Sequence, residues 1–233
     1  HIPCDEINSL LRDRFNNIWL GSIGGGVLMI DTKQSPFAFY SLNLAEDDVP
    51  TTAVRALFAD ADKDLWLGTG SYGLARKDYE TGVLSFFSHI PEFSDIPSVP
   101  TVNYIIQRKN GEVWFATYDG GILIYEKGEK VKVLTESDTP YLYSDCVSAL
   151  CEDSKGNCWV GCRGGMGISL ADGGHYRFGT LSFAGGGLAD WYHVKDIVED
   201  ADGSFWIATA NYGIIHIMGD VQHPETLKYS NYS

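Results

Sequence analysis

The sequence predicts an all-β chain in which one four-stranded antiparallel unit is repeated five times. A tryptophan recurs at intervals of 47, 48, 45 and 47 residues, and the residues around it keep the same order in each copy. A strand-forming run leads through a polar turn into the tryptophan, a small residue and a glycine. Such self-similarity is typical of an array of identical supersecondary units. The five tryptophans are Trp19, Trp66, Trp114, Trp159 and Trp206.

The repeat register extends to both sides of the tryptophan. Twelve positions before it stands an aliphatic residue: Ile7, Val54, Val102, Val147 or Val194. Two positions after it stands a small residue: Gly21, Gly68, Ala116, Gly161 or Ala208. A glycine follows a few positions later: Gly26, Gly73, Gly121, Gly167 or Gly213. The last set places a one-residue insertion in the fourth copy.

Each repeat resolves into four short strands. In the first repeat we expect strands at Ile7–Arg12, Ile18–Ser22, Val27–Ile30 and Phe37–Tyr40, with a polar turn at Asp13–Asn17 between the first two. The fourth strands of the later repeats are expected at Leu84–Phe87, Val131–Leu134, Tyr176–Phe178 and Leu227–Tyr229. Four strands of about five residues with their turns use about 45 residues, the size of one propeller blade.

The second strand indicates how the units pack. In Ile18–Ser22, alternation sends Trp19 and Gly21 to one face and Ile18 and Leu20 to the other. Both faces are apolar, so each sheet needs a neighbour on both sides, with the indole lying over the slot left by the small residue two positions on. We therefore predict a single β-propeller region over residues 1–233. Its blades are expected at approximately residues 5–41, 52–88, 100–135, 145–179 and 192–230.

Composition narrows the classes of partner. The 233-residue chain has a formal charge of −14 and a pI near 4.7, which disfavours nucleic acid and anionic membrane surfaces because binding there requires Lys and Arg to neutralise phosphates. It holds no run of eighteen apolar residues that could span a membrane. The chain opens at His1 without Met and without a signal peptide, and we expect it to be a piece of a longer protein.

The repeat signature resembles a known family. Val194 and Ile197 precede an Asp200–Gly203 turn, which leads into Trp206. This pattern is similar to the two-component regulator propeller repeat, and the similarity covers essentially the whole chain. The resemblance implies the periplasmic sensor region of a hybrid two-component system of gut Bacteroidetes, including Bacteroides, within an inner-membrane protein.

The same resemblance implies further parts and a ligand. Seven-bladed propellers of this family are followed by a small β-sandwich, a membrane helix and a histidine kinase with regulator domains. Their ligands are typically oligosaccharides released during polysaccharide breakdown. The chain departs from the pattern in having five repeats, which we interpret as truncation. It also carries Arg108 where the other copies carry aspartate: Asp13, Asp60, Asp153 and Asp200.

Four cysteines, Cys146, Cys151, Cys158 and Cys162, crowd the fourth repeat and would suit a zinc site or a disulfide. Other repeats place ordinary apolar residues at the corresponding positions, so we favour their interpretation as small buried hydrophobes. The odd total of five cysteines argues against a complete disulfide framework. The glycine clusters precede no helix and no Gly-Lys-Ser/Thr, as a nucleotide site would require. We expect neither metal nor cofactor.

The candidate ligand site is the loop between the second and third strands, together with the connectors between repeats. The connectors are Leu42–Thr52, Ser88–Thr101, Thr135–Cys146 and Gly179–His193. Aromatic rings offer flat faces to a pyranose, while Asp, Asn and Arg bond its hydroxyls. The candidate ligand-binding residues are Tyr72, Tyr118, Asp119, Arg163, Trp191, His193, Asn211 and Tyr212. Alternatively, Tyr72, Tyr118 and Tyr212 pack over the glycine loops or rim the surface.

The leading hypothesis is a non-enzymatic, ligand-sensing propeller. Its expected partners are an oligosaccharide, the remaining blades and downstream domains of the same sensor, and a second copy in a homodimer. One alternative is a protein-interaction or dimerisation scaffold, which would expose a contiguous apolar patch. Another is a propeller lyase similar to the streptogramin lyases, which needs convergent acid and base groups that the sequence does not offer.

Overall fold

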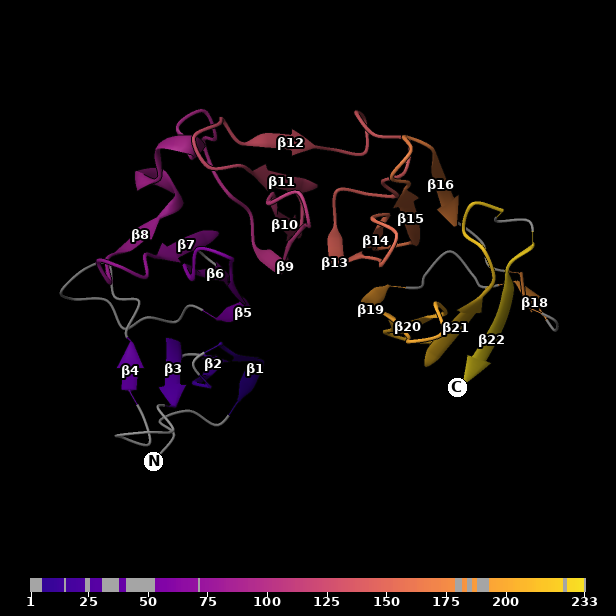
Figure 1. The fold of residues 1–233 in the computed structure, drawn as a ribbon, viewed down its shortest axis with the longest axis horizontal. Coiled ribbons are helices and arrows are strands. Elements are labelled where there is room, and N and C mark those ends of the chain that lie inside the picture. Colours follow the sequence, from indigo (N-terminus) through magenta and orange to yellow (C-terminus); the bar gives the residue numbers. More distant parts are fainter. Residues whose placement is uncertain are drawn as a thin grey trace. The chain divides into compact units, whose positions relative to one another are not determined.

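The structure, a computed structural model, describes residues 6–14, 16–23, 26–30, 38–40, 53–70, 72–178, 182–183, 186–187, 193–223 and 226–232 (Figure 1). These residues form five four-stranded antiparallel sheets, and in each sheet the strands neighbour one another in chain order. The prediction of an all-β chain built from repeated four-stranded blades is confirmed. The number of blades in a complete propeller, the blade boundaries and the single continuous region stay predictions.

The first two sheets lie in the N-terminal half of the sequence. The first consists of β1 (Ile7–Arg12), β2 (Ile18–Ser22), β3 (Gly26–Ile30) and β4 (Ala38–Tyr40). The second consists of β5 (Val54–Ala59), β6 (Leu65–Thr69), β7 (Leu74–Lys77) and β8 (Leu84–Phe86). Two short 3₁₀ helices follow: η1 (Phe87–His89) and η2 (Pro91–Phe93).

The remaining sheets repeat the same order. The third consists of β9 (Val102–Gln107), β10 (Val113–Thr117), β11 (Ile122–Tyr125) and β12 (Lys132–Leu134). The fourth consists of β13 (Val147–Glu152), β14 (Cys158–Cys162), β15 (Gly165–Ser169) and β16 (His175–Phe178). The fifth consists of β19 (Val194–Glu199), β20 (Phe205–Thr209), β21 (Ile214–Met218) and β22 (Lys228–Tyr232), and a separate pair is formed by β17 (Ser182–Phe183) and β18 (Gly186–Gly187).

The chain divides into two compact units. The first unit comprises His1–Gln107, Gly111–Phe115 and Tyr125–Val131. The second unit comprises Arg108–Asn110, Ala116–Ile124 and Lys132–Ser233.

Each first hairpin is closed by a hydrogen bond from the repeated tryptophan to a carboxylate in the turn. The indole Nε1–H of Trp19 donates to Asp13 Oδ2 at 3.0 Å, and Trp66 donates to Asp60 at 2.8 Å. Trp159 donates to Asp153 at 3.1 Å and Trp206 donates to Asp200 at 3.0 Å. A bond to an ionised acceptor is stronger than a neutral one, so the carboxylate holds the turn and the indole in one geometry.

The third repeat makes the same bond with a different residue. Arg108 takes the place of the aspartate, and the indole of Trp114 donates instead to Glu112 Oε2 at 2.9 Å. Arg108 itself lies 3.2 Å from Glu152 and donates to the carbonyl of Gly156 at 3.0 Å, both within the second unit. The third repeat therefore keeps the hydrogen bond from the indole to a carboxylate, and Arg108 adds contacts with Glu152 and Gly156 of the fourth repeat.

The glycine two positions after the tryptophan makes room for the next repeat in the first, second and fourth repeats. A Cβ on Gly21 would lie 2.9 Å from Val54 Cγ1, and one on Gly161 would lie 2.5 Å from Val194 Cγ1. These distances are far below van der Waals contact. The valine that begins the following repeat therefore occupies the slot beside Gly21 and Gly161, and the position of the indole over the slot stays a prediction.

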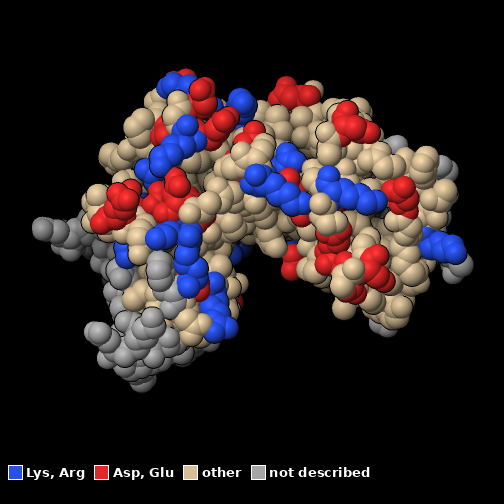
Figure 2. Space-filling view, viewed as in Figure 1, with Lys and Arg blue, Asp and Glu red and all other residues tan. Residues whose placement is uncertain are grey.

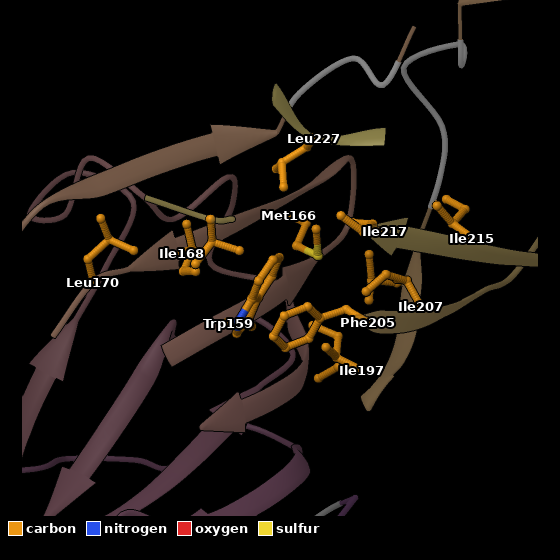
Figure 3. Close-up of a cluster of buried hydrophobic side chains, with 13 residues drawn as sticks. Trp159, Met166, Ile168, Leu170, Ile197, Phe205, Ile207, Ile215, Ile217 and Leu227 are labelled. Atoms are coloured by element: carbon orange, nitrogen blue, oxygen red, sulfur yellow. The ribbon is translucent and has the colours of Figure 1, made fainter. Parts of the chain in front are cut away.

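Apolar cores lie between consecutive sheets within each unit. In the second unit, Trp159 packs against Phe205 of the next sheet, with ring centroids 4.1 Å apart, and Met166 and Ile197 lie beside them (Figure 3). In the first unit, Trp19 belongs to a buried cluster that also draws on the second sheet. Burial on both faces of the second strand agrees with the alternation in the sequence.

Two connectors pack into the protein rather than standing out as binding loops. Ile90 and Phe93 in the second connector are 2% and 1% exposed, and the ring of Phe93 stacks on Tyr125. In the third connector Leu142 is fully buried, as Tyr141 nearly is. Leu42–Thr52 and most of Gly179–His193 lie outside the described residues. The apolar side chains of these two connectors therefore contribute to the buried cores.

The fourth repeat differs from its expected register. Cys162 pairs with Gly165, which leaves a two-residue loop, whereas Ser22 pairs with Gly26 in the first repeat. The loop is one residue shorter than the others, so the expected one-residue insertion is wrong. Gly167 lies inside β15, where a Cβ would stand 1.8 Å from the carbonyl oxygen of Tyr141. Gly167 is therefore not part of the loop. It lacks a side chain because the backbone of the third connector lies directly against it.

We predict that Gly161→Val lowers the free energy of unfolding by about 1–3 kcal/mol, because the added methyls overlap Val194. Ala208→Val is the matched control, since Ala208 holds the same repeat position but is partly exposed. The control should cost less than about 1 kcal/mol. Denaturant unfolding of both variants measures the difference, and equal losses would contradict the role assigned to the valine.

We predict that Asp153→Ala lowers the free energy of unfolding by about 3 kcal/mol, because it leaves buried donors without their charged acceptor. Asp153 is 1% exposed and accepts from the Lys155 and Asn157 amides, the Asn157 side chain and the Trp159 indole. Asp172→Ala, an exposed turn aspartate that accepts from Gly174, should cost less than about 1 kcal/mol. A small loss for Asp153→Ala in denaturant unfolding would argue against the importance of the turn carboxylate.

Candidate ligand-binding site

The loop between the second and third strands lies next to the start of the first strand of the same repeat. A backbone N–H in the loop donates to the carbonyl just before the first strand. These bonds are Ile23 to Glu6 at 3.2 Å, Gly70 to Ala53 at 2.9 Å, Arg163 to Cys146 at 2.9 Å and Ala210 to His193 at 2.9 Å. The loops and the repeat starts therefore share one end of each sheet, as the antiparallel order requires.

In the second unit these segments form a continuous row. The amide of Gly121 donates to the carbonyl of Asp145 at 2.9 Å, and Arg163 pairs with His193 in an isolated antiparallel bridge. Together with the bonds above, these contacts connect loops of the third, fourth and fifth repeats. We call this surface the loop row: residues 117–121, 145–146, 163–164, 193–195 and 210–212.

Most of the sequence-predicted site residues lie on the loop row. Asp119, Arg163 and Asn211 are exposed, and Tyr118 is 53% exposed. His193 is half-buried between the fourth and fifth repeats. Trp191 lies outside the described residues. The structure thus brings Tyr118 and Asp119 of the third repeat, Arg163 of the fourth and His193 at the start of the fifth onto one edge of the second unit.

Two of the predicted tyrosines have packing roles. Tyr72 belongs to the first unit, where its ring meets Phe86 edge-on with centroids 6.0 Å apart. Tyr212 packs against the buried cluster of the second unit. Both backbone amides donate to the threonine hydroxyl three residues earlier at 3.0 Å. Tyr212 therefore contributes to packing, whereas Tyr72 contacts Phe86 and is still 38% exposed, and Tyr118 is the aromatic ring that the loop row exposes most clearly.

Electrostatics on the loop row centre on His193. Burial lowers the pKa of His193, and the nearby cations Lys195 and Arg163 lower it further. Its Nε2 atom is buried and has no hydrogen-bond partner among the described residues. Burial raises the pKa of the Cys146 thiol, an effect that Arg163 and Lys195 oppose and Asp119 reinforces. The negative charge of Asp119 and the positive charges of Arg163 and Lys195 therefore all lie close enough to the Cys146 thiol to affect its pKa.

Two residues of the loop row, Cys146 and Lys195, are absent from the predicted ligand-binding residues, although Cys146 ends one of the connectors assigned to the candidate site. The signal was present in the repeat register, since Cys146 precedes Val147 as His193 precedes Val194. Lys195 stands directly after that valine, on a strand that was assigned only a structural role. Both residues become candidates because the Arg163–His193 bridge brings the fourth and fifth repeats together.

The cysteines of the fourth repeat are free thiols in the structure. Burial raises the pKa of Cys158 to about 12 and that of Cys162 to about 11, which keeps both thiols protonated at neutral pH. Within the described residues, no group of three or more His, Cys, Asp or Glu side chains could hold a metal ion. Buried, protonated thiols at these positions behave as small apolar side chains.

Comparison with a protein family supports the repeat pattern. The family model of the two component regulator propeller matches residues 1–24 and 144–164. These segments include the first turn of the chain and the hairpin that contains Trp159. The resemblance to these propeller repeats is confirmed. No curated protein sequence matches the chain significantly.

Solved structures similar to this chain are propellers of several kinds. The extracellular domain of BT4673 from B. thetaiotaomicron, described as a hybrid two component system, is 18% identical with a TM-score of 0.59, and the match covers 99% of this chain and 34% of that one. Virginiamycin B lyase from Staphylococcus aureus is 15% identical with a TM-score of 0.68, over 98% of this chain and 70% of that one.

A third similar structure is PorZ, a surface component of the type-IX secretion system of Porphyromonas gingivalis. It is 18% identical with a TM-score of 0.67, and the match covers 98% of this chain and 34% of PorZ. The chain spans 29–35% of the length of the matched B. thetaiotaomicron domains. Identities this low show the fold alone.

The described part of the chain contains no helix long and apolar enough to cross a membrane.

We predict that lowering the pH from 7 to 5 weakens the fold partly through His193. Its pKa is lower in the folded protein than in the unfolded chain, so the unfolded state binds more protons in the interval between the two values. Stability is therefore lost as the pH falls through the ordinary histidine range. His193→Gln should flatten this loss in a series of denaturant unfolding curves, and parallel curves for both proteins would contradict the burial of the imidazole.

Proposed function

We propose that the chain is the ligand-sensing propeller of a periplasmic hybrid two-component sensor, and that it binds an oligosaccharide on the loop row. The observation that carries the proposal is the gathering of exposed Tyr118, Asp119 and Arg163 next to His193, from three different repeats. The match to the two component regulator propeller supports the sensor assignment.

The side chains of the loop row suit a sugar. The half-exposed ring of Tyr118 offers an apolar face to a pyranose, while Asp119 can accept hydrogen bonds from its hydroxyls. Arg163 supplies donors in a planar fork, and hydrogen bonds to charged groups are the stronger kind. A site of this composition gives orientation and specificity through few polar groups.

The proposed activity is binding without catalysis. A propeller lyase needs an acid and a base in hydrogen-bond reach of the substrate and oriented by further groups. In the described residues, His193 Nε2 has no hydrogen-bond partner that would orient it. The likeness to virginiamycin B lyase lies at 15% identity and concerns the fold.

The loop row also offers a route for signalling. A ligand on the loop row would contact the third, fourth and fifth repeats at once. It would bind most tightly to the conformer in which these repeats give it the most contacts, and would therefore increase the population of that conformer. We propose that this change in population is transmitted to the remaining blades, to the downstream domains of the sensor and to a second copy in a homodimer. The similar extracellular domains of Bacteroides sensors support a periplasmic position, in an inner-membrane protein.

The proposal predicts that one class of oligosaccharide raises the thermal unfolding midpoint of the chain. Ligand at a hundred times its dissociation constant stabilises the folded state by about 2.7 kcal/mol, which is readily measured. The combined variant Tyr118→Ala, Asp119→Asn should lose this shift while its own midpoint stays close to that of the parent. Tyr79→Ala is the control, because this exposed tyrosine lies in the β7–β8 turn at the other end of the strands.

A panel of plant, host and microbial oligosaccharides covers the ligand class. Absence of a shift with every member would overturn the oligosaccharide assignment and favour the interaction scaffold. A shift that survives in the Tyr118 and Asp119 variant would move the site away from the loop row.

A further inference from the structure

A recess lies in the first unit, at the end of the strands opposite to the loop that carries Tyr72. It has a volume of about 220 Å³ and is lined by the turn between β1 and β2, by β3, and by the two turns of the second sheet. Nothing in the proposed function uses this recess. Its lining divides into an apolar floor and a charged rim.

The floor is apolar and partly aromatic. Trp19 and Leu65 are almost completely buried, and Met29 and Ala59 complete the inner wall. An apolar cavity of roughly 150 Å³ accommodates benzene. The recess therefore has room for one ring with a short arm, and is too small for an oligosaccharide of several rings.

The rim carries three cations. The ammonium of Lys77 lies 5.5 Å from the ring centroid of Trp19, and that of Lys63 lies 4.7 Å from the ring of Tyr79. The guanidinium of Arg14 donates to the carbonyls of residues 60 and 61 at 3.0 and 2.8 Å, which holds it across the rim. Aromatic faces and backbone carbonyls thus position positive charge around the opening.

Among the described residues that line the recess, the two acidic side chains are engaged within their own turns. Asp13 accepts from the Trp19 indole and from both nitrogens of Asn17. Asp78 accepts from the amide and the hydroxyl of Thr81 at 2.8 and 2.7 Å, and these bonds lower its pKa. An anion at the opening would therefore meet cations before it met an uncommitted carboxylate, although the whole chain is strongly acidic.

The corresponding recess of the second unit provides an internal comparison. It lies at the same turns of the fourth and fifth sheets, has a volume of about 290 Å³, and its acidic side chains are Asp153, Glu199, Asp202 and Asp220. Its one cation, Lys155, lies 3.5 Å from Asp220. The repeated architecture therefore creates both recesses, while the cationic rim is specific to the first.

We propose that the first-unit recess binds a small organic carboxylate with a flat apolar body. The ring would lie against Trp19, Met29 and Leu65, and the carboxylate would face Lys63 and Lys77. The apolar floor without the rim would accept any small ring, and the rim without the floor would accept any anion. Their combination selects molecules that have both features.

The test uses 3-phenylpropionate as the probe and isothermal titration calorimetry on the whole chain. We expect saturable binding, at least about tenfold weaker binding of the uncharged isostere 3-phenylpropionamide, and equally weak binding of propionate, which lacks the ring. The combined variant Lys63→Gln, Lys77→Gln should weaken binding of the acid by about tenfold and leave binding of the amide unchanged. Lys155→Gln in the second-unit recess and Tyr118→Ala on the loop row should bind the acid as the parent does.

A second readout does not depend on the variants. The NMR signal of the Trp19 indole N–H should shift on addition of 3-phenylpropionate to the parent chain, and the shift should saturate with the same affinity as the calorimetry. Absence of saturable binding, equal affinities for the acid and the amide, or equal weakening by Lys155→Gln would each overturn the proposal. The oligosaccharide assignment is tested on other residues, so either one can fail without the other.

Discussion

The structure depends on one hydrogen bond, repeated five times, from a tryptophan indole to a carboxylate in the first hairpin of each repeat. The bond ties the turn to the middle of the second strand and so sets the register of the hairpin. Its importance is clearest in the third repeat, where Arg108 removes the usual acceptor and Glu112 restores it from another position. A carboxylate serves better than a neutral group, because a hydrogen bond to a charged acceptor is the stronger kind, and the bonds of Trp66 and Trp159 are also buried.

The register places a small residue opposite the valine that opens the next repeat. Gly161 meets Val194 in this way, and Gly21 meets Val54. Packing of the valine against the glycine therefore joins these consecutive sheets without a contribution from the loops, and the loops at both ends can differ in sequence. In the second unit, the loop between the second and third strands contributes to the loop row, and in the first unit the turns at the other end of the strands line the recess with its cationic rim. On the face seen in Figure 2, basic and acidic side chains lie interspersed, so a local cationic opening is compatible with an acidic chain.

The candidate site was only partly predictable. Repeat position was enough to select Asp119, Arg163 and His193, because loop residues at corresponding positions share an end of the fold. It could not separate the exposed Tyr118 from Tyr212, which packs on a core, since both lie in the loop between the second and third strands of their repeats. That difference depends on which neighbouring side chains cover each ring, a matter of contacts between residues distant in the sequence.

By itself, the sequence determined the class and the period of this fold. Alternating apolar residues and turn chemistry act over a few positions, so β1 and β2 have the bounds expected for them. Only the tertiary structure decided what fills the slot beside each small residue, why Gly167 lies within β15, and that Phe93 in a connector completes a core. Each of these depends on steric contact between separate repeats or connectors, which no local pattern specifies. The charges around the recess became a single rim for the same reason: the fold brings together turns that lie more than forty residues apart in the chain.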